Sequence, residues 1–249
     1  MRLTDMPVAI FVLTLVVLWL CARAGTLLAR FDPRDAHEDL GMVLAATLTL
    51  LGLIIGFSFS MATNRYDMRK NYEEAEANAI GTEYLRAGLL PDAQAAHTRA
   101  LLKEYLAQRI LFYNTHDTGA LVQINTRTGE LQNALWSSVR DAASANPTMI
   151  VALAVSGMND VINSQGYTQA AWWNRIPSGA WALMVLIALV GNLMLGFTAY
   201  HLKSHAVLLS VLPLVVAIAF FLIADIDSPR GGVIHVSPQN LLALGPSLN

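Results

Sequence analysis

The sequence has little charge and almost no cysteine. Only 14% of its 249 residues are Asp, Glu, Lys or Arg, and the formal net charge is −2. A nucleic-acid partner favours a clear excess of positive charge, so we expect none. Cys21 is the single cysteine, which excludes an intrachain disulfide and leaves the redox compartment open. Catalytic-triad, phosphate-loop and dinucleotide signatures are also missing, so we expect neither an enzyme nor a bound cofactor.

Long uncharged stretches are what the sequence has instead, and the mean hydropathy is +0.46. Four stretches carry no charge: Met6–Ala22, Leu40–Asn64, Ile176–Tyr200 and Ala206–Ala224. Each is long enough to cross a bilayer, the first only just. Ala22-Arg23-Ala24 also resembles a signal-peptide cleavage site, so cleavage stays open as an alternative to an uncleaved first helix.

The polar block between the second and third stretches reads as helical throughout. We expect helices over 64–90, 92–113 and 120–145 and a fourth from residue 147, with Asp92 and Asn146 as caps. A short link, His201–His205, joins the last two apolar stretches. The predicted class is an all-α membrane protein with four transmembrane helices and a helical bundle inserted between the second and third. The expected segments are 1–63, 64–175, 176–226 and a tail, 227–249.

Basic residues near the helix ends predict sidedness. Those expected beside the polar block and the termini are Arg2, Arg65, Arg69, Lys70, Arg175 and Arg230. Those expected on the opposite side are Arg23, Arg30, Arg34 and Lys203. The bias places both termini and the polar block in the cytoplasm.

Two motifs resemble a bacterial membrane family that is described as a bestrophin-like domain of unknown function. The first is Glu74–Arg86 (EAEANAIGTEYLR), and the second is Asp225–Gly232 (DIDSPRGG) followed by Val236-Ser237-Pro238. Gly56-Phe57 and Arg65-Tyr66 resemble, more distantly, the second membrane helix of true bestrophins. Those proteins are pentameric anion channels with four membrane helices, and their second helix lines the pore and continues into a cytoplasmic body. Here no breaker interrupts Gly56–Gly81, so the same continuity is expected.

The resemblance implies a homo-oligomeric ion channel, with five subunits and anions as the expected ions, in the bacterial inner membrane. It places Thr49, Leu53, Phe57 and Ser60 on the pore, because their spacing of four, four and three forms one helical stripe. Packing of this stripe against the other membrane helices is the alternative. The sequence lacks the paired tryptophans and the dense acidic cluster of animal bestrophins, so calcium gating is not implied.

Two other functions stay open. One is a membrane-anchored scaffold or sensor whose helical block binds a partner. The other, ranked third, is a motor-type proton channel, which needs an acid or polar relay that the uncharged stretches do not show.

Several charged residues have competing interpretations. The pairs Arg69–Glu73 and Glu83–Arg86 are typical of an exposed helix. Glu73, Glu76 and Glu83 share one face, but we favour a solvated face over a metal site. Asp225 and Asp227 follow the fourth stretch, and we expect structural ion pairs there, with Arg65 or Arg230 as the partner of Asp225, rather than a proton relay. His201 and His205 have metal-ligand spacing without a third ligand, so no metal is expected.

Overall fold

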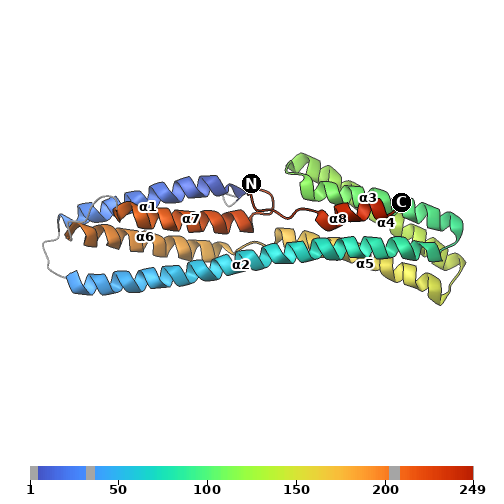
Figure 1. Cartoon of the computed structure of the whole chain (residues 1–249), viewed down its shortest axis with the longest axis horizontal. Helices are drawn as coiled ribbons and strands as arrows, with labels where there is room; N and C mark the ends of the chain where they lie inside the picture. Colours follow the sequence, from blue (N-terminus) through green and yellow to red (C-terminus); the bar gives the residue numbers. More distant parts are fainter. Residues whose placement is uncertain (1–4, 32–36, 202–207, 249) are drawn as a thin grey trace. The chain divides into compact units, whose positions relative to one another are not determined.

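The computed structural model describes residues 5–31, 37–201 and 208–248, and every element in these ranges is a helix (Figure 1). The α-helices are α1 (Pro7–Ala29), α2 (His37–Arg86), α3 (Asp92–Asn114), α4 (Thr118–Ala145), α5 (Met149–Trp173), α6 (Ser178–His201), α7 (Leu208–Asp227) and α8 (Gln239–Leu244). Two 3₁₀ helices cover Ala87–Leu89 and Gly245–Leu248. The predicted all-α class is confirmed.

The chain divides into two compact units. The membrane unit comprises Met1–Tyr66 and Arg175–His235, and the bundle unit comprises Asp67–Asn174 and Val236–Asn249. Helix α2 starts in the first and ends in the second as one helix of 50 residues. The predicted continuity through Gly56–Gly81 is therefore confirmed.

The membrane unit holds α1, the first part of α2, α6 and α7. Four helical segments of the described chain are long and apolar enough to cross a membrane, which agrees with the four stretches seen in the sequence. Their shared core contains Leu18 from α1, Leu51 from α2, Met184 from α6 and Phe220 from α7. The protein is a membrane protein on these grounds.

Helices α1 and α6 meet backbone to backbone. A Cβ atom added to Gly25 would overlap the carbonyl oxygen of Leu193, and one added to Gly196 would overlap that of Ala22. Only glycine allows this approach, which is the usual way that membrane helices pack closely in lipid.

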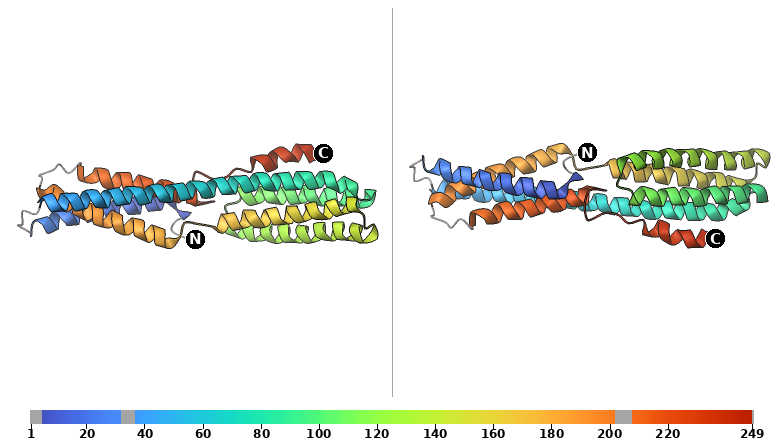
Figure 2. Two further views of the ribbon diagram at one scale, coloured as in Figure 1. Left: turned by 90° about the horizontal axis from the view of Figure 1, so that it is seen from below. Right: turned by 90° about the horizontal axis from the view of Figure 1, so that it is seen from above.

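The bundle unit packs the second part of α2 with α3, α4 and α5, which lie side by side in both views of Figure 2. Two of its helices start at side-chain caps: Asp117 accepts a hydrogen bond from the Ala120 N–H (2.7 Å), and Thr148 accepts one from the Val151 N–H (3.2 Å). The core between the helices includes Tyr105, Leu135 and Met158, all with no exposed surface.

Several predicted boundaries and caps are wrong. Helix α1 continues past Ala22 to Ala29, because Arg23 lies at its exposed surface and interrupts nothing. Asp92 is the first helical residue of α3 and does not cap it, and the cap of α5 is Thr148 rather than Asn146.

The end of the chain also differs from the expected tail. Residues 236–249 belong to the bundle unit and include α8, whose Leu241 is fully buried. Of the expected link His201–His205, His201 is the last residue of α6 and residues 202–205 lie outside the described residues, as do Arg2, Arg34 and Lys203 from the sidedness prediction.

Candidate functional site

Helix α2 buries one face from Leu51 to Glu83. The buried residues recur at intervals of three, four and seven, which keeps them on one side of a helix with 3.6 residues per turn. They are Leu51, Ser58, Ala62, Arg69, Glu73, Glu76, Ile80 and Glu83, and Ala77 beside Glu76 is buried as well. Their chemistry changes from apolar to charged where α2 passes from the membrane unit to the bundle unit.

The stripe proposed from the sequence lies on the opposite side of α2. Thr49, Leu53, Phe57 and Ser60 are all exposed, with Leu53 at 53% and Phe57 at 61% of their full surface. At 100° per residue, the centre of this stripe is about half a turn from Leu51 and Ala62. The stripe is therefore open to whatever lies outside this chain, and it does not pack on the other helices of the described structure.

The rest of this face is open as well. A Cβ atom added to Gly41, Gly52 or Gly56 would meet nothing within 4 Å. Only 6% of the apolar window of α2 is buried within the chain, compared with 50% for that of α7. Helix α2 is thus the membrane helix that its own chain covers least.

A buried ion pair lies at the centre of the bundle unit. The Arg109 Nε donates to Glu76 Oε1, and both side chains have no exposed surface. The other oxygen, Oε2, accepts from the hydroxyls of Thr168 (3.1 Å) and Tyr113 (3.4 Å). The guanidinium of Arg109 also lies 4.4 Å from the ring centroid of Phe112. The pair and its hydrogen bonds therefore join α2, α3 and α5.

Two tyrosines border this pair. Burial, and then the negative charge of Glu76, raises the pKa of Tyr105 and of Tyr113 well above the usual range. Both phenols stay protonated and available as hydrogen-bond donors. The hydroxyl of Tyr105 accepts from the Gln132 side-chain amide (3.3 Å), which also donates to Gln165 (3.3 Å).

Glu73 holds the end of the chain. Its carboxylate accepts from the Asn240 side-chain amide (2.6 Å) and from the Leu241 backbone N–H (2.9 Å), so it caps the start of α8 from another helix. The Tyr84 hydroxyl donates to the carbonyl of Leu248 at the other end of this segment. Both anchors belong to or adjoin the motif Glu74–Arg86.

Glu83 is buried without a hydrogen bond to its carboxylate from the described residues. A Cβ atom added to Gly157 would overlap Glu83 Oε2, so the carboxylate fills the space that this glycine leaves. Burial raises the Glu83 pKa to about 8, with Arg86 opposing the shift and Asp160 adding to it. The expectation of a solvated Arg/Glu face is therefore wrong for Arg69, Glu73, Glu76 and Glu83.

The acidic pair at the end of α7 has two separate roles. Asp227 accepts from Arg175 Nε (3.0 Å) and from the Ile176 backbone N–H (3.1 Å), and Arg175 Nη1 donates to Asp5 (2.9 Å). This cluster joins the end of α7 to the start of α6 and to the residues before α1.

Asp225 binds the backbone of the loop that follows α7. Its two oxygens accept from the backbone N–H groups of Val233 (2.8 Å) and Ile234 (2.9 Å). A Cβ atom on Gly232 would overlap the Asp225 carboxylate, and one on Gly231 would overlap the carbonyl of Asp5. The motif DIDSPRGG thus folds around its own first aspartate.

The arginine partners differ from those expected. The expected partner of Asp225 is Arg65 or Arg230, but its carboxylate accepts hydrogen bonds from backbone N–H groups instead. The glycine-rich loop that follows α7 folds back and brings these groups to the carboxylate. The Nε and Nη1 atoms of Arg65 have no hydrogen-bond partner among the described residues. Arg175 pairs with Asp227.

The sequence has two places whose residue spacing would suit a metal ion, the Glu73–Glu83 face and the His201–His205 pair. Among the described residues, no group of three or more His, Cys, Asp or Glu side chains is arranged to hold a metal ion. Glu73 and Glu76 point to different partners, α8 and Arg109. The His201–His205 pair falls outside the described side chains.

Comparison with known proteins agrees with this architecture. The family model of the Bestrophin-like domain matches residues 8–241. The chain belongs to this family. Among curated proteins, none matches the sequence significantly.

Solved structures show the same fold as this bestrophin-like chain. The crystal structure of a bacterial bestrophin homologue from Klebsiella pneumoniae matches with a TM-score of 0.68 at 12% identity, covering 95% of this chain and 96% of that one. A variant of that homologue with a leucine-to-threonine substitution matches with a TM-score of 0.66 at 13% identity, covering 96% and 97%. At this identity the likeness concerns the fold alone.

Sequence reasoning missed the residues that complete the two motifs. Arg109, Tyr113, Thr168 and Arg175 lie outside both motifs and supply the partners of Glu76 and Asp227. An arginine on the apolar face of the helix 92–113 is the one signal that could have pointed to a buried acid.

Proposed function

We propose that this bestrophin-like chain is one subunit of a closed homo-oligomeric ion channel in the bacterial inner membrane. The resemblance to bestrophins implies five subunits and anions as the conducted ions. The observation that supports the proposal most is the open face of α2, which carries Thr49, Leu53, Phe57 and Ser60 away from the rest of the chain. A ring of identical subunits would cover this face and surround an axis with it.

The stripe has the chemistry of a channel neck. Leu53 and Phe57 would form an apolar constriction one helical turn high, with the hydroxyls of Thr49 and Ser60 on either side of it. Apolar constrictions control conduction through wetting, because a narrow dry segment excludes hydrated ions until it widens. Between Thr49 and Ser60 the helix carries no charged residue, and Arg69, Glu73, Glu76 and Glu83 are buried on the opposite face.

Ion flux into liposomes tests the proposal. Phe57→Ala and Leu53→Ser should raise flux, because a wider or more polar neck holds water more easily. Phe59→Ala is the matched control, since Phe59 is also an exposed phenylalanine of α2 but lies outside the stripe. Chloride and potassium gradients, applied separately, report the ion selectivity. No flux in any variant, with the folded protein incorporated equally, would leave the scaffold or sensor as the better function.

Sidedness is tested separately. Asn125 is exposed on α4, and we place the bundle unit in the cytoplasm. A cysteine at this position, in a chain whose Cys21 is replaced, should resist an impermeant thiol reagent in intact cells. Rapid labelling would reverse the proposed topology.

A further inference from the structure

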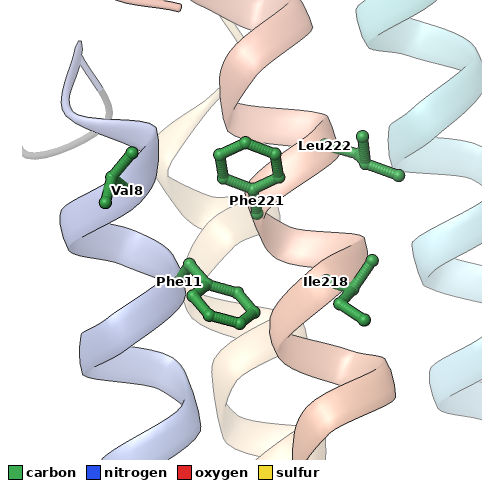
Figure 3. A pocket seen from close by; sticks show the side chains of 5 residues that line it. All are labelled: Val8, Phe11, Ile218, Phe221 and Leu222. Carbon is green, nitrogen blue, oxygen red and sulfur yellow. The ribbon is translucent and has the colours of Figure 1, made fainter.

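Helices α1 and α7 leave two apolar hollows along the seam between them. One, of about 330 Å³, is lined by Val8 and Phe11 from α1 and by Ile218, Phe221 and Leu222 from α7 (Figure 3). The other, of about 490 Å³, is lined by Leu15, Val16, Trp19 and Leu20 from α1 and by Ser210 and Leu214 from α7.

The two hollows are consecutive parts of one groove. On α1 the lining advances from Val8 through Leu15 to Trp19, while on α7 it recedes from Leu222 through Ile218 and Leu214 to Ser210. This is the register of two antiparallel helices, so the hollows follow one another along the seam. Phe11 and Phe221, which both line the smaller hollow, meet edge to face with ring centroids 6.2 Å apart.

One end of the groove carries a cation. The guanidinium of Arg23 lies 4.9 Å from the ring centroid of Trp19, one turn beyond the larger hollow. Both side chains are exposed. Tryptophan favours the level of the lipid headgroups, and arginine extends its charge toward water from an apolar stem. The larger hollow is thus apolar along its length and positively charged at its mouth.

We propose that a membrane phospholipid binds here, with one acyl chain in the groove and its phosphate at Arg23. From Leu20 to Phe11 the groove is about 14 Å long at 1.5 Å per residue. This matches half of the roughly 30 Å hydrocarbon core, which is the depth that one leaflet's acyl chain occupies. Charge complementarity favours a phospholipid, because its phosphate brings an anion to Arg23 while its acyl chain matches the apolar lining. The site needs only that α1 and α7 span the bilayer, and it does not depend on conduction.

Native mass spectrometry of the full chain in detergent, titrated with phosphatidylglycerol, tests the site. Arg23→Gln should raise the lipid concentration for half-occupancy about tenfold, as expected for one lost charge-assisted contact. Leu214→Phe, which fills the larger hollow, should have a similar effect. Arg30→Gln and Val215→Phe are the matched controls, because Arg30 is exposed at the same end of α1 and Val215 is exposed next to Leu214, but neither lines the groove. Both controls should bind like the unchanged chain.

Three results would overturn the proposal. Equal occupancy in a test variant and its control would mean that lipid adheres without this site. Weaker lipid binding in only one of the two test variants would mean that Arg23 and the groove do not bind the same lipid molecule. A Val16→Cys chain lacking Cys21 that forms a disulfide between subunits would show that a second copy, rather than a lipid, covers the seam.

Discussion

In the membrane unit the buried face of α2 carries Leu51, Ser58 and Ala62, whereas in the bundle unit the same face carries Glu73, Glu76 and Glu83. The opposite, exposed face also changes along the helix: it is apolar at Leu53 and Phe57 in the membrane unit and polar or charged in the bundle unit. One helix thus exposes large apolar side chains in one half and buries three acids in the other.

The surroundings explain the difference. Lipid tails are as apolar as leucine, so Leu53 and Phe57 gain little by turning inward, and small residues can take the packed face. In the bundle unit water competes for every charge, and an acid is buried at low cost only where partners replace the water. Glu76 has four such hydrogen bonds, and Glu73 has two. Glu83 lacks such partners among the described residues and is the weak point of this face.

The largest effect should come from breaking the buried pair. Arg109→Ala leaves Glu76 charged and without its cation, which costs about 3–5 kcal/mol of unfolding free energy for a buried ion pair. We expect a large fall in the thermal unfolding midpoint of the detergent-solubilised protein. Arg127→Ala is the matched control, because Arg127 pairs with Glu104 and Glu130 at the surface of the same unit. A fall of equal size in both variants would contradict the special cost of the buried pair.

The sequence predicts the continuity of α2 well, but it predicts poorly which of its charged side chains are buried. Its continuity follows from the absence of glycine and proline between Phe57 and Ile80, and the apolar stretches follow from their length. Burial of the acids cannot be predicted in this way, because spacings of three and four residues occur on exposed and buried helix faces alike. Burial of Glu76 depends on Arg109, which lies 33 residues further along the chain and on another helix. Helix α8 has six residues and is capped by Glu73 from a distant segment, so no local signal marks its start.

The next effect concerns glycines on the two sides of the membrane unit. Gly196 touches the backbone of α1, whereas Gly52 faces open space on α2. Gly196→Ala should lower the unfolding free energy by about 1–3 kcal/mol, because the added methyl overlaps a backbone that cannot move independently. Gly52→Ala should not lower it. Thermal unfolding in detergent measures both, and an unchanged midpoint for Gly196→Ala would contradict the close α1–α6 contact.

The Glu83 prediction concerns pH. Its pKa is raised from 4.5 to about 8 in the folded protein, so between these values the folded state holds a proton that the unfolded state has lost. The unfolding free energy attributable to Glu83 therefore falls as pH rises from about 4.5 to 8. Glu83→Gln removes this dependence and should stabilise the protein by about 1–2 kcal/mol near pH 8, because the amide carries no charge that burial penalises.

Unfolding midpoints measured across this pH range check the prediction. Glu74→Gln is the control, because Glu74 is exposed on the same helix and its substitution should leave the pH profile unchanged. Identical profiles for Glu83→Gln and the unchanged chain would mean that Glu83 is ionised in the fold at neutral pH.

The smallest effect on unfolding should come from the open face of α2, where the effect on assembly is larger. Gly56→Leu meets no atom of its own chain, so the unfolding midpoint of the subunit should change little. Gly56 lies on the flank of the Thr49–Ser60 stripe, where neighbouring pore helices of a ring would approach each other, and a leucine there would hold them apart. We expect a smaller fraction of assembled particles by native mass spectrometry. Gly129→Leu places the same side chain at an equally open helical glycine of α4 and should leave assembly unchanged. If both variants assemble like the unchanged chain, the open face of α2 meets lipid, and the ring with α2 at its axis is wrong.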